Sequence, residues 1–260
     1  MALSSGDFRV YMRTLAGWVW QEQKDAFSFD LILHEETITE FLLLKMARVL
    51  TPLGFRVQLY NHFEEGGRPN SKRADLEGHG ADWEWFYSSR ACMVSFRVQA
   101  KRLGPSPKRL GKYDAFDPRH RQVRQLISMA GQANPIYVFY NHPKVKDDHL
   151  FTQSGAPDYF GRSCWGCSVT TAAFMLSVSD NKLGTIHPGQ VPWHRFFSIA
   201  EDCRPRRAMA EMPGDQKFVQ ADKEPEWVKL LPDNERGRDD RLDGYLAEHG
   251  LKGVAYFGLS

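Results

Sequence analysis

Apolar and polar residues recur along the chain with two different periods, and these periods predict its secondary structure. Between residues 7 and 24 apolar side chains appear every three or four positions, which is typical of an amphipathic helix. The same spacing predicts a second helix over residues 35–50, which Pro52 and Gly54 bring to an end. Two helices that each bury one face are therefore expected near the start of the chain.

In the middle of the chain apolar and polar residues alternate with a period of two, which is typical of strands. Strands are predicted over residues 55–63, 81–87 and 92–102, and the last of these places Ser95, Arg97, Gln99 and Lys101 on one face. A helix over 118–130 and a buried apolar strand over 135–141 follow. This order predicts an α/β fold, in which helices flank a central mixed β-sheet that contains a crossover.

The second half of the chain has a weaker pattern. A helix is expected over 170–177, an irregular polar segment over 202–234, and two short elements over 239–249 and 253–259. A chain of 260 residues suits one domain with additions. We therefore expect residues 1–141 to form the core with its N-terminal helix, and residues 142–260 to be an elaboration that packs on it within the same domain.

Composition excludes several classes of protein. Charged residues make up 25% of the chain and hydrophobic residues 42%, which excludes wholesale disorder. No apolar run approaches the roughly 18 residues of a membrane helix, and the first ten residues lack a secretion signal. The four cysteines are too few for a disulfide scaffold and fit a reducing compartment. We expect a soluble cytoplasmic protein with no membrane partner.

Positive charge is concentrated in one segment, although the net charge is only +2. Residues 101–124 carry eight Lys or Arg against two Asp, a local charge of +6, so the rest of the chain carries 2 − 6 = −4. Such a segment is either a solvated face or a surface for nucleic-acid phosphates.

Three polar residues of different chemistry fall at neighbouring strand positions. Asp82 opens one predicted strand, while Gln99 and Lys101 share a face near the end of the next. An antiparallel pairing of these strands would bring a carboxylate, an amide and an ammonium together. A carboxylate can bind a divalent cation, and a lysine can stabilise charge that develops on a phosphoryl group. Glu35 and Glu36, in the first turn of the second helix, add carboxylates, and this combination points to phosphodiester chemistry.

An ordered set of motifs carries a family resemblance. Over residues 30–141 the chain resembles an uncharacterised bacterial family. That family is similar to the PD-(D/E)XK, or restriction-endonuclease-like, nucleases, and the chain looks like their QxK variant. The matching residues are Glu36-Thr37-Ile38-Thr39, Gly80-Ala81-Asp82-Trp83-Glu84-Trp85, Arg97-Val98-Gln99-Ala100-Lys101-Arg102-Leu103, Gln122 with Leu126 and Ile127, and the segment 135–141.

The resemblance implies a restriction-endonuclease-like core and a Mg²⁺-dependent endonuclease, with Mn²⁺ as a substitute metal. It makes Glu36, Asp82 and Gln99 metal ligands and Lys101 the catalytic lysine. It also implies a nucleic-acid substrate, with DNA favoured over RNA, and similar domains are effectors of bacterial anti-phage defence. A protein partner or a second copy of the chain would control the activity. The residues expected to contact nucleic acid are Lys108, Arg109, Lys112, Arg119 and the inward-facing Gln122.

The site assignment leaves alternatives open. Gln99 replaces the usual acidic ligand and removes one negative charge from the metal site. The apolar stripe of the helix slightly favours Glu35 over Glu36 as its inward carboxylate, and Glu84, two positions after Asp82, is an alternative second carboxylate ligand. Trp83 and Trp85 alternate with these carboxylates, and we expect them in the core.

Two rival functions remain. The first is a nuclease-like fold that only binds nucleic acid or serves as a subunit assembled with a partner. The second is a zinc-stabilised interaction protein, because Cys164 and Cys167 have metal-ligand spacing. Its further ligands would be Cys203 and either His187 or His194. The four histidines that flank the proposed site in the sequence are candidates for proton transfer, and they are His34, His62, His79 and His120.

Overall fold

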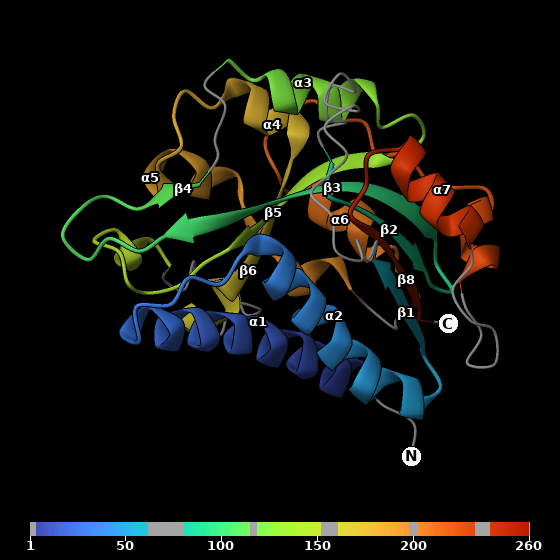
Figure 1. The fold of residues 1–260 in the computed structure, drawn as a ribbon, viewed down its shortest axis with the longest axis horizontal. Coiled ribbons are helices and arrows are strands. Elements are labelled where there is room, and N and C mark those ends of the chain that lie inside the picture. The colour runs from blue at the N-terminus through green and yellow to red at the C-terminus, as the bar shows by residue number, and fades with distance from the viewer. Residues whose placement is uncertain are drawn as a thin grey trace.

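In the part of the chain that the structure describes, the strands form one mixed eight-stranded sheet. The computed structural model describes residues 4–61, 81–114, 119–151, 161–197, 202–231 and 240–259. The strand order is β1-β8-β2-β3-β5-β6-β7, and β4 pairs with β3 beside this path (Figure 1). The strands are β1 (Arg56–Asn61), β2 (Trp83–Ser88), β3 (Met93–Gly104), β4 (Lys112–Tyr113), β5 (Asn134–Tyr140), β6 (Cys167–Thr171), β7 (Val191–Pro192) and β8 (Gly253–Gly258). The predicted α/β class with a central mixed sheet is confirmed.

Helices lie around the sheet. The α-helices are α1 (Ser5–Ser28), α2 (Glu35–Leu50), α3 (Arg121–Ser128), α4 (Ala172–Ser177), α5 (Leu183–Ile186), α6 (Arg204–Ala210) and α7 (Asp240–Glu248). The 3-10 helices are η1 (Thr51–Leu53), η3 (Asp148–Leu150), η4 (Arg162–Gly166), η5 (His187–Gly189), η6 (Trp193–Phe196) and η7 (Glu226–Leu230). The predicted bounds of α2 are confirmed, and Gly54 ends η1 with a φ of 89°, a conformation that glycine adopts at little cost.

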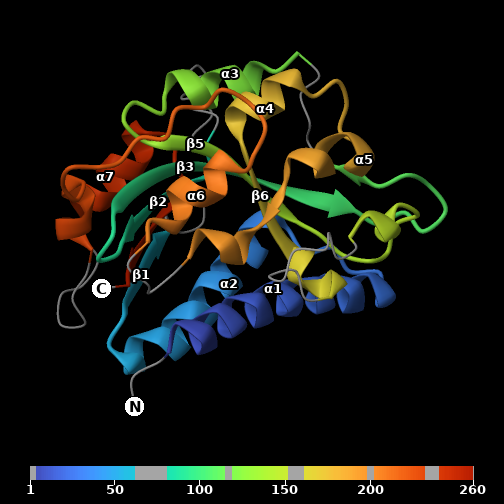
Figure 2. The same ribbon diagram turned by 180° about the vertical axis from the view of Figure 1, so that it is seen from behind.

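The sheet has a separate hydrophobic core on each side. Residues of α1, α2 and α6 pack with one face of the sheet. Residues of α3, α4, α5 and α7 pack with the other face. The two views show α1 and α2 together along one side of the molecule and α3 and α4 on the opposite side (Figures 1 and 2).

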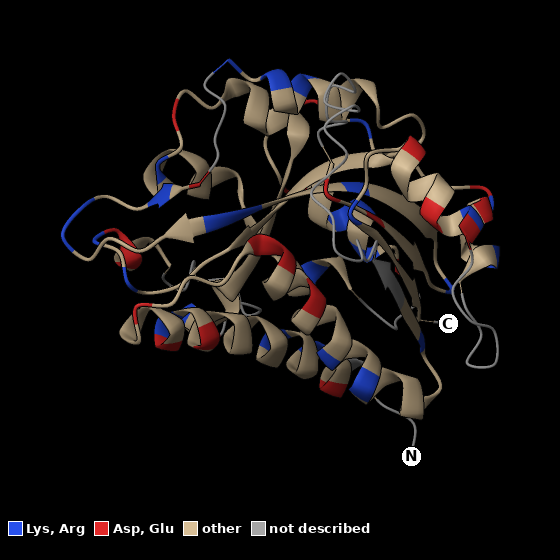
Figure 3. Cartoon of the chain, in the orientation of Figure 1, with Lys and Arg blue, Asp and Glu red and all other residues tan. Residues whose placement is uncertain are grey.

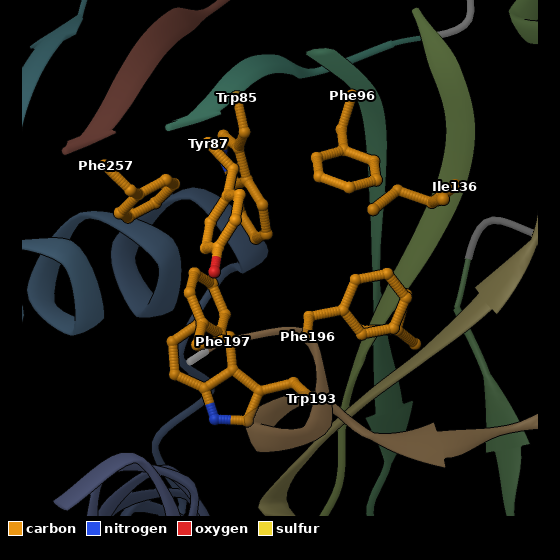
Figure 4. A pocket seen from close by; sticks show the side chains of 9 residues that line it. Trp85, Tyr87, Phe96, Ile136, Trp193, Phe196, Phe197 and Phe257 are labelled. Carbon is orange, nitrogen blue, oxygen red and sulfur yellow. The ribbon is translucent and has the colours of Figure 1, made fainter. Parts of the chain in front are cut away.

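Aromatic side chains dominate the core beneath α1 and α2. Trp83 and Trp85 are 1% and 3% exposed, so their predicted burial is confirmed. Trp85, Phe96 and Phe197 surround a cavity of about 10 Å³, which is apolar and has room for about one water molecule (Figure 4). This cavity is a packing defect of the core and is too small for a ligand.

The second half of the chain supplies strands to the sheet of the first half. Strand β6 pairs with β5. The segment 170–177, which the sequence predicted to be helical, begins with the last two residues of β6 and continues as α4. Strand β8 lies between β1 and β2, antiparallel to β1 and parallel to β2. Strand β8, which comes last in the sequence, is thus inserted between two strands of the first half of the chain.

The cysteines do not form the zinc site of the second rival function. Cys203 is joined to Cys92 by a disulfide, which departs from the expectation of reduced thiols. Cys164 and Cys167 are buried in the interior. The zinc ligand set fails because α6, which begins directly after Cys203, packs into the core beneath α1 and α2 and brings Cys203 to Cys92. None of the helices in the described ranges is long and apolar enough to cross a membrane.

Candidate active site

The candidate site lies where the sheet is interrupted beside β3. Strand β2 begins at Trp83, opposite Val98, whereas β3 continues to Gly104 and pairs there with β4. Within the described residues, the edge of β3 between these two partners has no strand beside it, over residues 99–102. The first turn of α2 approaches β3 on this side, so polar side chains can gather in the interruption.

The side chain of Asp82 hydrogen-bonds to the part of the β3 edge that has no neighbouring strand. Its Oδ2 accepts a hydrogen bond of 3.0 Å from the backbone N–H of Ala100, and its backbone N–H donates to Val98 over 2.8 Å. The carboxylate satisfies an amide that would otherwise lack a partner at an open edge. This local requirement fixes the Asp82 carboxylate against β3.

Gln99 connects Asp82 to helix α3. Its amide nitrogen donates to Oδ2 of Asp82, and its amide oxygen accepts a 2.8 Å hydrogen bond from Nε2 of Gln122. The predicted inward position of Gln122 is therefore confirmed, and its side chain serves this network instead of the exposed nucleic-acid surface. Gln99 is only 4% exposed, and both ends of its amide are bonded within the protein. The Gln99 side chain therefore holds the Asp82 carboxylate in place.

Lys101 is a buried ammonium beside these groups. It is 5% exposed, and burial lowers its pKa below the usual 10.5, although the carboxylates of Asp82, Glu35 and Glu36 oppose this shift. Desolvation of the charged form outweighs the attraction of the carboxylates. The fold therefore retains a cation at this position at a cost in stability, which is common for groups that serve function.

The first turn of α2 is fixed to strand β5. The hydroxyls of Thr39 and Tyr140 share a hydrogen bond, and Thr39 also donates to the backbone oxygen of Glu35 over 2.8 Å. Glu35 and Glu36 lie at the helix N-terminus, where the helix dipole stabilises negative charge. Glu35 acts on Lys101 through its charge, whereas Glu36 forms an ion pair with Lys252. Both glutamates therefore belong to the site.

Lys252 is a site residue that the sequence analysis missed. It directly precedes β8, and its backbone N–H donates to the backbone oxygen of Asp82 over 2.8 Å. Its Nζ lies 2.8 Å from Oδ1 of Asp82 and also contacts Oε1 of Glu36. Its position just ahead of an apolar strand was the only signal in the sequence, since its partners lie far away along the chain.

The cationic and anionic groups of the site influence one another. Burial lowers the pKa of Lys252, but Asp82 and Glu36 outweigh burial and raise this pKa above 10.5. Burial raises the pKa of Glu36, but Lys252, a backbone hydrogen bond and His34 together outweigh burial, so the net shift is downward. Three carboxylates, those of Glu35, Glu36 and Asp82, stand with two ammonium groups, those of Lys101 and Lys252, which gives a net charge of −1.

Glu84 is held in a separate network, which corrects its assignment as an alternative metal ligand. Its carboxylate accepts hydrogen bonds from Trp227 at 2.9 Å and from Tyr245 at 2.7 Å, and it pairs with Arg97 at 3.0 Å. Its carboxylate oxygens are bound by partners from η7, α7 and β3, so Glu84 is not a metal ligand of the candidate site.

The basic segment divides into buried and exposed parts. Arg102 is buried and pairs with Asp114. The predicted nucleic-acid contacts Lys108, Arg109, Lys112 and Arg119 are exposed. Basic positions lie along the chain after β3 and on α3, and the acidic first turn of α2 lies beside β3 (Figure 3).

Two of the four histidines that flank the site in the sequence are described. His34 is the N-cap residue of α2 and His120 is the N-cap residue of α3. His62 and His79 lie outside the described residues.

The arrangement fits a hard divalent cation with few protein ligands. Among the described residues, no group of three or more His, Cys, Asp or Glu side chains could hold a metal. Two carboxylates, however, converge on one cationic point, because Asp82 and Glu36 both contact the Lys252 ammonium. Mg²⁺ is commonly held by one or two carboxylates and completes its shell with water and substrate phosphates. Asp82 and Glu36 would therefore hold it.

The comparisons with known proteins place the chain in a family. A family of unknown function, DUF6615, matches residues 8–257. The chain belongs to this family. The match spans α1 to β8, so it includes Lys252 and the interrupted sheet as well as the motifs. No curated protein and no solved structure matches the chain.

Proposed function

We propose that this DUF6615 protein is a Mg²⁺-dependent nuclease that hydrolyses phosphodiester bonds of nucleic acid. The observation that carries the proposal is the interruption beside β3, where Asp82 is fixed by Gln99 next to the buried ammonium of Lys101. A carboxylate, an amide and a lysine from two adjacent strands are the groups that the QxK resemblance requires. Glu36 adds a second carboxylate from α2.

Each residue has a part in the proposed hydrolysis. Asp82 and Glu36 would hold the divalent cation, which when bound supplies a Lewis acid and makes water a better nucleophile. Lys101 stabilises the negative charge that develops on the phosphoryl oxygens, and its burial strengthens this effect because water screens it little. Gln99 orients Asp82, and Gln122 in turn orients Gln99.

The exposed basic side chains would bind the sugar-phosphate backbone. Lys108, Arg109, Lys112 and Arg119 offer contacts that depend on salt and carry no base sequence information. DNA remains favoured over RNA as the substrate through the resemblance alone. Localisation in the cytoplasm, an effector role in anti-phage defence, and control by a protein partner or a second copy of the chain likewise remain predictions.

The test is cleavage of a panel of labelled DNA and RNA substrates, single- and double-stranded, in Mg²⁺, Mn²⁺ and EDTA. Asp82→Asn keeps an oxygen for the Ala100 amide but removes the charge, so we expect cleavage to fall by a factor of about 100–1,000. The control is Asp222→Asn, at an exposed position, which should cleave as wild type does. Metal-dependent cleavage that survives Asp82→Asn would refute the site. Binding without cleavage by wild type would favour the nucleic-acid-binding alternative.

A further inference from the structure

The ammonium of Lys252 bridges two carboxylates that come from different parts of the fold. Asp82 directly precedes β2 and Glu36 lies in the first turn of α2, and Lys252 is separated from Glu36 by 216 positions in the sequence. The bridge therefore exists only because β8 is inserted beside β2. Nothing in the QxK motif requires a lysine at this position.

The bridge occupies the point on which the two proposed metal ligands converge. A divalent cation that bound Asp82 and Glu36 would need the carboxylate oxygens that now contact Nζ of Lys252. An ammonium and a hard metal ion are both attracted by paired carboxylates, so the two would exclude each other by charge as well as by space. Binding of one is then a competition with the other.

The two lysines of the site differ in their freedom to leave. The Lys252 side chain is 48% exposed, and its flexible stem can carry the ammonium into solvent. Its backbone stays in place through the hydrogen bond to the Asp82 oxygen. Lys101, at 5% exposure, is enclosed and has no comparable route. Lys252 is thus the cation that can be exchanged, and Lys101 is the cation that stays.

Building on the function proposed above, we propose that Lys252 is a resident cation that occupies the metal position and must be displaced when a divalent metal binds. It keeps Asp82 and Glu36 paired with a positive charge in the metal-free protein, so that the carboxylates do not repel each other across the interruption of the sheet. Its presence weakens metal binding, and it sets the metal concentration at which the site becomes loaded.

The direct test is a Mn²⁺ titration of purified full-length protein, followed by calorimetry, without substrate. Lys252→Met keeps an unbranched stem and removes the charge, so we expect Mn²⁺ to bind about tenfold more tightly than to wild type. This factor corresponds to the loss of one competing charge-assisted hydrogen bond at the weak end of the usual range. Lys252→Arg retains the competing charge and should stay close to wild type.

The control for net charge is Lys229→Met, at an exposed position on η7, which should leave Mn²⁺ affinity unchanged. A second measurement uses mass spectrometry to follow acylation of lysines by an amine-reactive ester. Saturating Mn²⁺ should raise the labelling of Lys252 severalfold and leave Lys229 unchanged. Thermal unfolding of each variant establishes that it is folded before the titration is interpreted.

The outcomes separate this inference from the function on which it rests. Equal or weaker Mn²⁺ binding by folded Lys252→Met, in a protein whose wild type cleaves nucleic acid with metal, overturns the inference alone. Absence of Mn²⁺ binding in wild type and Lys252→Met, together with absence of metal-dependent cleavage, overturns both. Mn²⁺ binding that is seen only in Lys252→Met supports the competition directly.

Discussion

Replacing Lys101 with methionine should separate catalysis from stability. The Lys101 side chain is 5% exposed and its pKa is lowered mainly by burial, so the folded protein holds this proton less readily than the unfolded chain does. The resulting cost is fully present below the lowered pKa and shrinks as pH rises through that pKa toward 10.5. Methionine preserves the unbranched stem and removes the charge that carries this cost.

Two opposite effects follow from that substitution. Loss of a group that stabilises the charged phosphoryl transition state should cost about 3–4 kcal/mol, which lowers the rate of cleavage by a factor of about 100–1,000. Removal of the desolvated charge should raise the free energy of unfolding by about 0.5–2 kcal/mol, as is common when a functional group is deleted. For a chain of this size each kcal/mol shifts Tm by about 2–4 °C.

The assay pairs initial cleavage rates at saturating Mg²⁺ with thermal unfolding followed by circular dichroism. Lys229→Met removes a charge from an exposed position outside the proposed site and serves as the control, with rates close to wild type and an unchanged Tm. Wild-type rates in folded Lys101→Met would refute its catalytic role. A lower Tm in Lys101→Met would refute the argument from burial, because it would make the ammonium a structural counter-ion for the neighbouring carboxylates.

Three further predictions concern other parts of the molecule. Gln99→Glu places a carboxylate against Asp82, so we expect a lower Tm without metal and a larger rise in Tm on adding Mn²⁺, whereas Gln99→Leu should lose most of the Mn²⁺ response in differential scanning fluorimetry. Reversing Lys108, Arg109 and Lys112 to Glu should weaken nucleic-acid binding and flatten its salt dependence by about one unit of log-log slope per lost contact, and unchanged titrations would make the segment a solvated face. Burial lowers the pKa of His142 to about 4 from 6.5, so stability should fall by as much as about 3 kcal/mol as pH drops from 6.5 toward 4. His142→Gln should flatten this acid limb in urea unfolding, and an unchanged slope would contradict the assignment.

The local elements and the nucleus of the site could be predicted from the sequence. Periodicity placed α2 over Glu35–Leu50, because amphipathic spacing and a glycine terminator act within a few residues of one another. Alternation along β3 put Gln99 and Lys101 on one face, and the adjacent antiparallel strand brought Asp82 beside them. These contacts depend on neighbouring elements, whose pairing follows from short-range pattern.

Tertiary structure decided the features that depend on distant partners. The end of β6 lies in a segment that had been predicted to be helical, and strand pairing with β5 overrides the local preference there. Glu84 has the right parity for the site, but Trp227, 143 positions away, and Arg97 bind its carboxylate. Lys252 enters the site only through the insertion of β8 beside β2. Sequence patterns report which face of its own element a side chain occupies, whereas the partner that meets that face is set by packing across the whole chain.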